Sequence, residues 1–266
     1  MDRLIHRISS KGLGEVGMSQ RREGLVQATS RISIYAFTLL ELLLVISIIG
    51  LLMALTLPNL RGMRQSNVMA SANRQLLDDL ALARHRAISS RSTVYVVFVP
   101  PATWINPATA RLSPVQEEQL LRGQFNSYTM FSRRQIGEQP GRENPRFLSP
   151  LRSLPDGIFI QTNKFDLLNP GWRFETNLFP FPTVTNENLL LPYIAFDFQG
   201  RLITARGEER IPLARGSIFH DRVPAGLAWA TADARETPPL NSVVNSNHVV
   251  IDGLTGRATI VRPEIQ

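Results

Sequence analysis

Glu41 is a single carboxylate within an otherwise uncharged apolar run at residues 36–57. An ionised carboxylate in apolar surroundings is costly and is usually kept for a function. A chain cut between Ala36 and Phe37 would carry a new α-amino group four residues before Glu41. In a low dielectric, that amine could pair with Glu41 of a neighbouring subunit and fix the register of packed helices. Alternatively, Glu41 is protonated or reaches the polar edge of the apolar region.

Other residue types that perform chemistry are sparse. There is no cysteine, which excludes disulfides, thiolate metal ligands and cysteine nucleophiles. The four histidines lack ligand spacing, so we expect no metal site. The acidic pairs at 78–79, 117–118 and 208–209 are adjacent, and adjacent side chains point in different directions on a helix or strand. With no catalytic motif present, the sequence predicts no catalytic residue, no cofactor and no enzyme activity.

The apolar run itself has the length of a membrane span. Its 22 residues would rise about 33 Å as a helix, against a hydrocarbon core of about 30 Å. We therefore expect a transmembrane helix at 37–58. A secretory signal peptide is the alternative, but the run is too long and is followed by Pro58-Asn59-Leu60 rather than a small-residue cleavage site. Arginines flank both ends, so charge alone leaves the orientation open.

Residues 36–43 (AFTLLELL), followed by the apolar run and Pro58, resemble the type IV prepilin motif. The resemblance implies that residues 1–36 are a basic leader removed by a prepilin peptidase after Ala36, where the family usually has Gly. It implies N-methylation of Phe37 and filament assembly through Glu41 and Pro58, where the helix bends or melts on packing. It also implies a single-pass inner-membrane protein with a cytoplasmic N-terminus and a periplasmic head. Met18 is an alternative start of the leader.

An amphipathic continuation of the helix is expected at 59–91. Apolar residues recur there at spacings of three and four, which indicates one buried stripe: Met69, Ala72, Leu76, Leu80, Ala83 and Ala87. Asp78 and Asp79 fall mostly off this stripe. The run Arg84-His85-Arg86 is interpreted as a solvated face.

From residue 92 to 266 the pattern changes to short strands and turns, which predicts a β-rich head. The clearest strands are 93–99 and two hairpins, 193–198 with 201–204 and 247–251 with 257–261. Weaker strands are expected at 127–131, 158–162, 216–220 and 227–230, and an elaborated loop region at 100–155. The predicted fold is α+β, with the long N-terminal helix, transmembrane in its first half, packed on a mostly antiparallel sheet.

The head also resembles the GspH/FimT minor pseudopilins. The resemblance rests on residues 73–97 and on the Gly-Arg hairpins at 196–203 (FDFQGRLI) and 250–261 (VIDGLTGRATIV). Gly200 and Gly256 are expected to supply turn geometry, with Arg201 and Arg257 on the surface. Residues 100–188 have no counterpart in this resemblance.

These features predict a structural subunit, a minor pseudopilin or pilin, of a type II secretion or type IV pilus-like filament. The implied partners are a prepilin peptidase, other pilin subunits, the inner-membrane assembly machinery and the lipid bilayer. One alternative is a DNA-binding minor pilin for DNA uptake, using the arginines at 201, 206, 210, 257 and 262. The formal charge of +7 falls to +4 without residues 1–36, which hold six basic and three acidic residues. Another alternative is a plain membrane-anchored β-domain protein.

Overall fold

The computed structural model describes residues 38–105, 112–134, 137–138, 143–169, 171–204, 207–220, 232–244 and 247–261, with the side chains of 55–66 and 244 outside the description. The chain divides into two compact units, Met1–Met53 and Ala54–Gln266. Helix α1 (Leu39–Ser90) contributes to both. Each unit is described by itself below. The leader at 1–36, with Ala36 and Phe37, lies outside the described residues.

The described part of the first unit is the beginning of α1. No helix among the described residues is long and apolar enough to cross a membrane. The predictions of a transmembrane segment at 37–58, an inner-membrane location, a cytoplasmic N-terminus and a periplasmic head are therefore wrong. The backbone of α1 continues through Pro58, so that proline does not end the helix.

In the second unit, the rest of α1 supplies one side of the core. The predicted stripe is buried, with Ala72, Leu76, Leu80, Ala83 and Ala87 all at most 1% exposed. The helix ends at Ser90, close to the predicted end. Packing of this stripe against the core is the main source of stability for this part of α1, because an amphipathic helix is stabilised chiefly by tertiary contacts.

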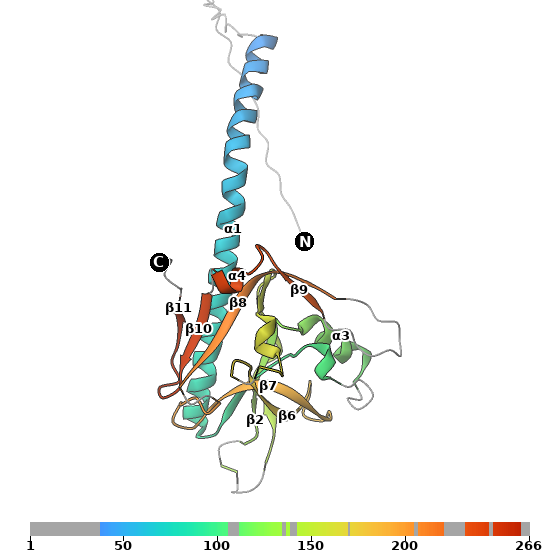
Figure 1. The fold of residues 1–266 in the computed structure, drawn as a ribbon, viewed down its shortest axis with the longest axis vertical. Helices are drawn as coiled ribbons and strands as arrows, with labels where there is room; N and C mark the ends of the chain where they lie inside the picture. Colours follow the sequence, from blue (N-terminus) through green and yellow to red (C-terminus); the bar gives the residue numbers. More distant parts are fainter. Residues whose placement is uncertain are drawn as a thin grey trace, which may run out of the picture. The chain divides into compact units, whose positions relative to one another are not determined.

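Strands β1 to β4, β6 and β7 form a six-stranded antiparallel sheet on which α1 packs (Figure 1). Its path is β3-β2-β1-β7-β6, and β4 also pairs with β2: β1 (Val94–Phe98), β2 (Ser127–Ser132), β3 (Arg146–Phe147), β4 (Arg152–Ser153), β6 (Glu175–Pro180) and β7 (Asn188–Phe196). Side chains of β1 alternate between two cores. Val94, Val96 and Phe98 face the α1 core, while Val97 joins a second core with Leu120 of helix α3 (Pro114–Gly123).

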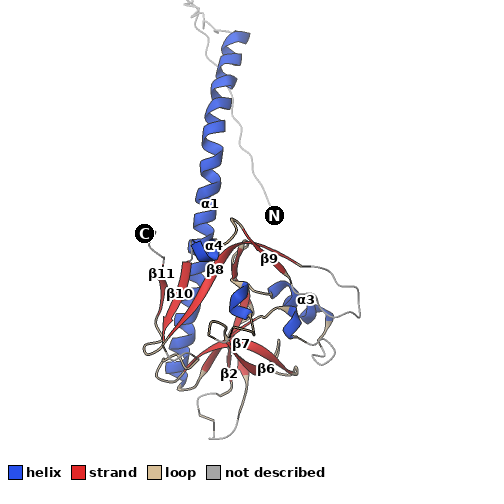
Figure 2. Cartoon of the chain, viewed as in Figure 1, coloured by secondary structure: helices blue, strands red, loops and turns tan. Residues whose placement is uncertain are grey.

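A second antiparallel sheet completes the unit (Figure 2). Its path is β11-β10-β8-β5, and β9 pairs with the far end of β8: β5 (Ile158–Ile160), β8 (Glu208–Phe219), β9 (Asp233–Glu236), β10 (Asn247–Asp252) and β11 (Ala258–Val261). Short helices η1 (Ala102–Trp104), η2 (Thr162–Phe165) and α4 (Asn241–Val244) connect the strands. The α+β class and the mostly antiparallel pairing agree with the prediction. The strand expected at 227–230 lies outside the described residues.

The region at 100–155, expected to be an elaborated loop, contains α3 and three strands. Helix α3 begins with a capping box, in which Ser113 and Gln116 each bond the other's backbone N–H, and Pro114 occupies its first turn. Both features favour a helix start. The prediction of a long loop at 100–155 was therefore wrong for residues 114–123, which form a helix with these start signals.

The turns of the two Gly-Arg segments meet each other and α1. Gly200 and Gly256 have φ of 78° and 62°, as predicted for turn glycines. A Cβ on Gly256 would lie 2.0 Å from the Gly200 carbonyl oxygen. Arg84 Nε donates to the carbonyls of Gly200 (3.1 Å) and Thr255 (2.7 Å). The interpretation of Arg84 as part of a solvated face is therefore wrong, since it holds two turns to the helix.

Candidate functional site

Glu41 lies in the first turn of α1 and is hydrogen-bonded to Thr38. The backbone N–H and the hydroxyl of Thr38 donate to Glu41 Oε2 at 3.1 and 3.0 Å. In return, the N–H of Glu41 donates to Thr38 Oγ1 at 3.2 Å. This is a reciprocal capping box, with Thr38 preceding the helix and Glu41 in its third position. A carboxylate here also complements the positive end of the helix dipole.

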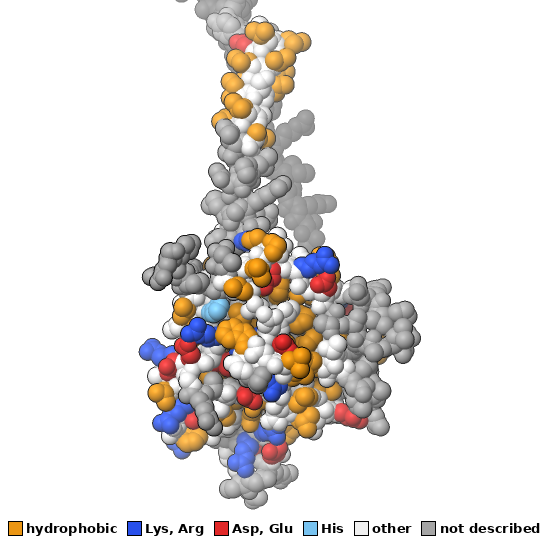
Figure 3. Space-filling model, viewed as in Figure 1, with side chains coloured by type: hydrophobic (Ala, Val, Ile, Leu, Met, Phe, Trp, Pro, Cys, Tyr) orange, Lys and Arg blue, Asp and Glu red, His pale blue; other side chains and the backbone are white. Residues whose placement is uncertain are grey.

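Behind this cap, large apolar side chains cover all sides of the helix. Twelve large apolar residues lie between Leu39 and Met53, and all are exposed, from 42% for Val45 to 81% for Leu39. Figure 3 shows apolar side chains along this part of α1, above the region drawn in grey. We call the described surface Leu39–Met53 the apolar sleeve. At Gly50 nothing lies within 4 Å of an added Cβ, so the helix backbone is open to a close neighbour.

The apolar sleeve can associate with other apolar surfaces. Soluble monomers rarely expose contiguous apolar patches of this size without an interaction. Full coverage of twelve such side chains would contribute on the order of 10 kcal/mol or more before association costs. Glu41 is the only charged residue among residues 38–54, so any partner that covers the sleeve also meets one carboxylate.

The structure describes only part of the other residues predicted for processing and assembly. Ala36 and Phe37 lie outside the described residues, as does the side chain of Pro58. Among the described residues, the neighbour of Glu41 is Thr38. Pairing of Glu41 with a new amine at Phe37 stays a prediction.

The structure describes three of the five arginines predicted for nucleic-acid contact, and two of them, Arg201 and Arg257, follow the glycine turns that contact each other. Arg206 and Arg262 lie outside the described residues. Arg210 Nε donates to Glu208 Oε1 at 2.7 Å, which offsets its charge. Arg201 and Arg257 are exposed and each directly follows one of the two turn glycines. An exposed arginine with a carboxylate beside it attracts phosphates weakly, which applies here to Arg210.

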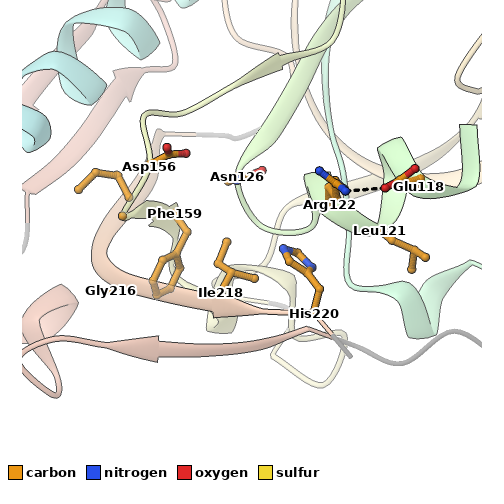
Figure 4. A pocket seen from close by; sticks show the side chains of 11 residues that line it. Glu118, Leu121, Arg122, Asn126, Asp156, Phe159, Gly216, Ile218 and His220 are labelled. Atoms are coloured by element: carbon orange, nitrogen blue, oxygen red, sulfur yellow. Dashed lines mark hydrogen bonds and ion pairs between the residues drawn. The ribbon is translucent and has the colours of Figure 1, made fainter. Parts of the chain in front are cut away.

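A cavity of about 680 Å³ lies between α3 and the strands β5 and β8 (Figure 4). Glu118 and Arg122 form an ion pair of 2.6 Å at its rim, and Asp156 lies on the opposite side. Burial lowers the pKa of His220, and the nearby Arg122 lowers it further. No group of three or more His, Cys, Asp or Glu residues that could hold a metal occurs in the described part of the chain.

Asp79 is a buried residue that the sequence interpretation placed off the stripe. Its carboxylate accepts a hydrogen bond of 2.7 Å from the Tyr128 hydroxyl and is ion-paired with Arg152. Burial, followed by the hydrogen bond to Asp79, raises the pKa of Tyr128 above its usual range. Asp79 is three residues after Leu76 and four before Ala83, so the helical period alone places it on the buried face.

A buried ion pair joins η2 to β8. Lys164 and Glu209 are 3% and 8% exposed and form a salt bridge. Lys164 Nζ also donates to the Trp172 carbonyl at 2.6 Å and lies 5.0 Å from the ring centre of Phe174. Burial raises the pKa of Glu209 and lowers that of Lys164, each opposed by the other's charge. Glu208 is exposed beside it, as expected for adjacent residues on a strand.

Comparisons with protein-family models, with curated proteins and with solved structures found no match.

Proposed function

We propose that this chain is a structural subunit of a pilus-like filament, assembled by packing of its apolar sleeve against the sleeves of other subunits. The observation that carries the proposal is the exposure of apolar side chains on every side of α1 between Leu39 and Met53. A helix that is apolar all round needs cover all round. One partner helix covers one face, whereas a helical array of subunits covers every face.

The capping box supports a defined beginning for the assembling helix. Thr38 and Glu41 hydrogen-bond each other, and α1 begins at Leu39, directly after the Thr38 cap. The prepilin resemblance implies cleavage after Ala36 and N-methylation of Phe37, the residue that precedes this cap in the sequence. We therefore propose that a prepilin peptidase cuts after Ala36 and that the mature chain begins at Phe37. The remaining residues, 54–266, are carried as the folded unit that the filament displays.

Analysis of the filaments themselves tests the proposal. Filaments are sheared from cells that possess the peptidase, and the chain within them is identified by mass spectrometry of its N-terminal peptide. The expected peptide begins at methylated Phe37. Absence of the chain from sheared filaments, or its presence with residues 1–36 intact, would contradict the proposal.

DNA uptake has less support as a function. Arg210 is paired with Glu208, and Arg201 and Arg257 follow turns that accept hydrogen bonds from Arg84 of α1.

A further inference from the structure

Three arginines line one small cavity at the end of α1. The cavity has a volume of about 390 Å³ and lies where α1 meets the ends of β2 and β3. Its cationic lining residues are Arg86, Arg134 and Arg146, and its polar lining includes Ser90 and Ser132. All its described lining residues are cationic, hydroxylic or apolar, with no carboxylate among them. We call these three arginines and their cavity the arginine pocket.

The three arginines come from α1, from β3 and from the segment that follows β2. Ser132 of β2 is directly opposite Arg146 of β3, so their side chains share one face of the sheet. Arg134 follows two residues after Ser132. Arg86 reaches from α1 and donates from Nη1 to the Leu148 carbonyl just beyond β3. One guanidinium is therefore anchored, while the other two extend from the sheet edge.

The arginine pocket has unbalanced positive charge. Among the described residues, neither Arg134 nor Arg146 has an ion pair, whereas Arg122 and Arg235 each pair with a carboxylate on their own element. The serine hydroxyls are engaged locally, because Ser90 Oγ donates to the Arg86 carbonyl and Ser132 Oγ donates to the Arg134 carbonyl. The free guanidinium N–H groups are thus the donors available to a ligand, and their mutual repulsion favours an anion between them.

We propose that the arginine pocket binds a phosphate group with two negative charges, as in inorganic phosphate or a phosphomonoester. Planar guanidinium forks match the oxygen geometry of phosphate and form strong charge-assisted hydrogen bonds. A phosphomonoester carries about −1.5 to −2 charges near neutral pH, which suits three clustered cations. The cavity is within the usual size range of ligand sites.

An adjoining hollow offers space for an organic part of the ligand. This hollow has a volume of about 440 Å³ and shares Arg146 and Phe147 with the arginine pocket. Leu151 and Phe181 supply apolar lining there. A phosphomonoester with an aromatic group would place its phosphate on the arginines and its ring against this apolar wall.

Calorimetric titration of the full chain in a mild non-ionic detergent tests the proposal, with inorganic phosphate and phenyl phosphate as probes. We expect both to bind, and phenyl phosphate to bind more tightly. Arg134→Ala combined with Arg146→Ala should weaken binding of both probes by about tenfold or more, because two charge-assisted contacts are lost. Arg122→Ala combined with Arg235→Ala removes the same charge from exposed positions elsewhere and should leave binding within about twofold.

Circular dichroism and thermal unfolding of each variant establish that it is folded. If phenyl phosphate binds no more tightly than inorganic phosphate, the phosphate site is supported, and the adjoining hollow does not bind an organic group. The proposal is overturned if neither probe binds the unmodified chain, or if both double variants weaken binding equally. Binding of a single-stranded oligonucleotide without binding of either probe would also overturn it, because the ligand would then be a phosphodiester.

Discussion

At the scale of single residues, Glu41 has two roles that make different demands on its side chain. As a helix cap it must accept hydrogen bonds from Thr38, which a neutral amide can also do. As the partner of an amine on another subunit it must carry a charge. The structure shows the hydrogen bonds of the capping role. The charged role belongs to the proposed filament.

Substitution at each end of the capping box separates the two roles. Glu41→Gln keeps an acceptor for Thr38 but removes the charge, and we expect filament incorporation to fall by about tenfold or more. Thr38→Ala removes the cap while keeping the charge, which should cost about 1 kcal/mol of local helix stability and leave incorporation largely intact. The measurement is the fraction of the chain that pellets with sheared filaments. Equal loss in both variants would assign Glu41 to capping alone.

Asp78 and Asp79 provide a matched pair for the second unit. Asp79→Ala leaves the Tyr128 hydroxyl without its acceptor and Arg152 without its partner. We expect a loss of about 2 kcal/mol in the free energy of unfolding, less than for a fully buried pair because Arg152 is 43% exposed. Asp78→Ala, on the exposed neighbour, should change stability by less than about 0.5 kcal/mol. Urea unfolding of both variants decides the matter, and similar values would contradict the buried role of Asp79.

At the scale of elements, the periodic features of the sequence were the most predictable. The apolar stripe of α1, the strand β1 and the hairpin β10–β11 follow from spacing and β-branched content, and the structure has them close to the expected residues. Helix α3 could have been predicted, because Ser113, Pro114 and Gln116 form a recognised start signal. The Lys164–Glu209 pair could not, since its partners are far apart in sequence and are brought together only by the tertiary fold.

The contact between the two glycine turns gives a prediction at this scale. Gly256→Ala places a Cβ 2.0 Å from the Gly200 carbonyl oxygen at a φ of 62°. We expect a loss of about 2–4 kcal/mol in the free energy of unfolding, from steric overlap and backbone strain together. Gly171→Ala is the control, because nothing lies within 4 Å of its added Cβ. Comparable unfolding midpoints for the two variants would show that the turns do not pack as described.

At the scale of the whole molecule, the two units differ in how their apolar residues are covered. Residues 54–266 enclose two clusters of buried apolar side chains around the six-stranded sheet. The described part of residues 1–53 instead leaves its apolar side chains exposed. The apolar content of 36–57 was evident from the sequence, but its use was misjudged: the length suggested a bilayer span, while the described helix is not long and apolar enough for one.

Cysteine scanning of the apolar sleeve tests assembly between subunits most directly. The chain has no native cysteine, so each introduced thiol can form a disulfide only with its counterpart in another copy. Single cysteines are placed in turn at positions 43–51, with Leu254→Cys, at a site 79% exposed in the folded unit, as the control. Disulfides require Cα atoms within about 7 Å, so the yield reports close helix contact. We predict cross-linked dimers at positions on several faces of the sleeve, and little cross-linking at position 254. Sleeve variants that stay monomeric, or that cross-link no more than the control, would contradict the account.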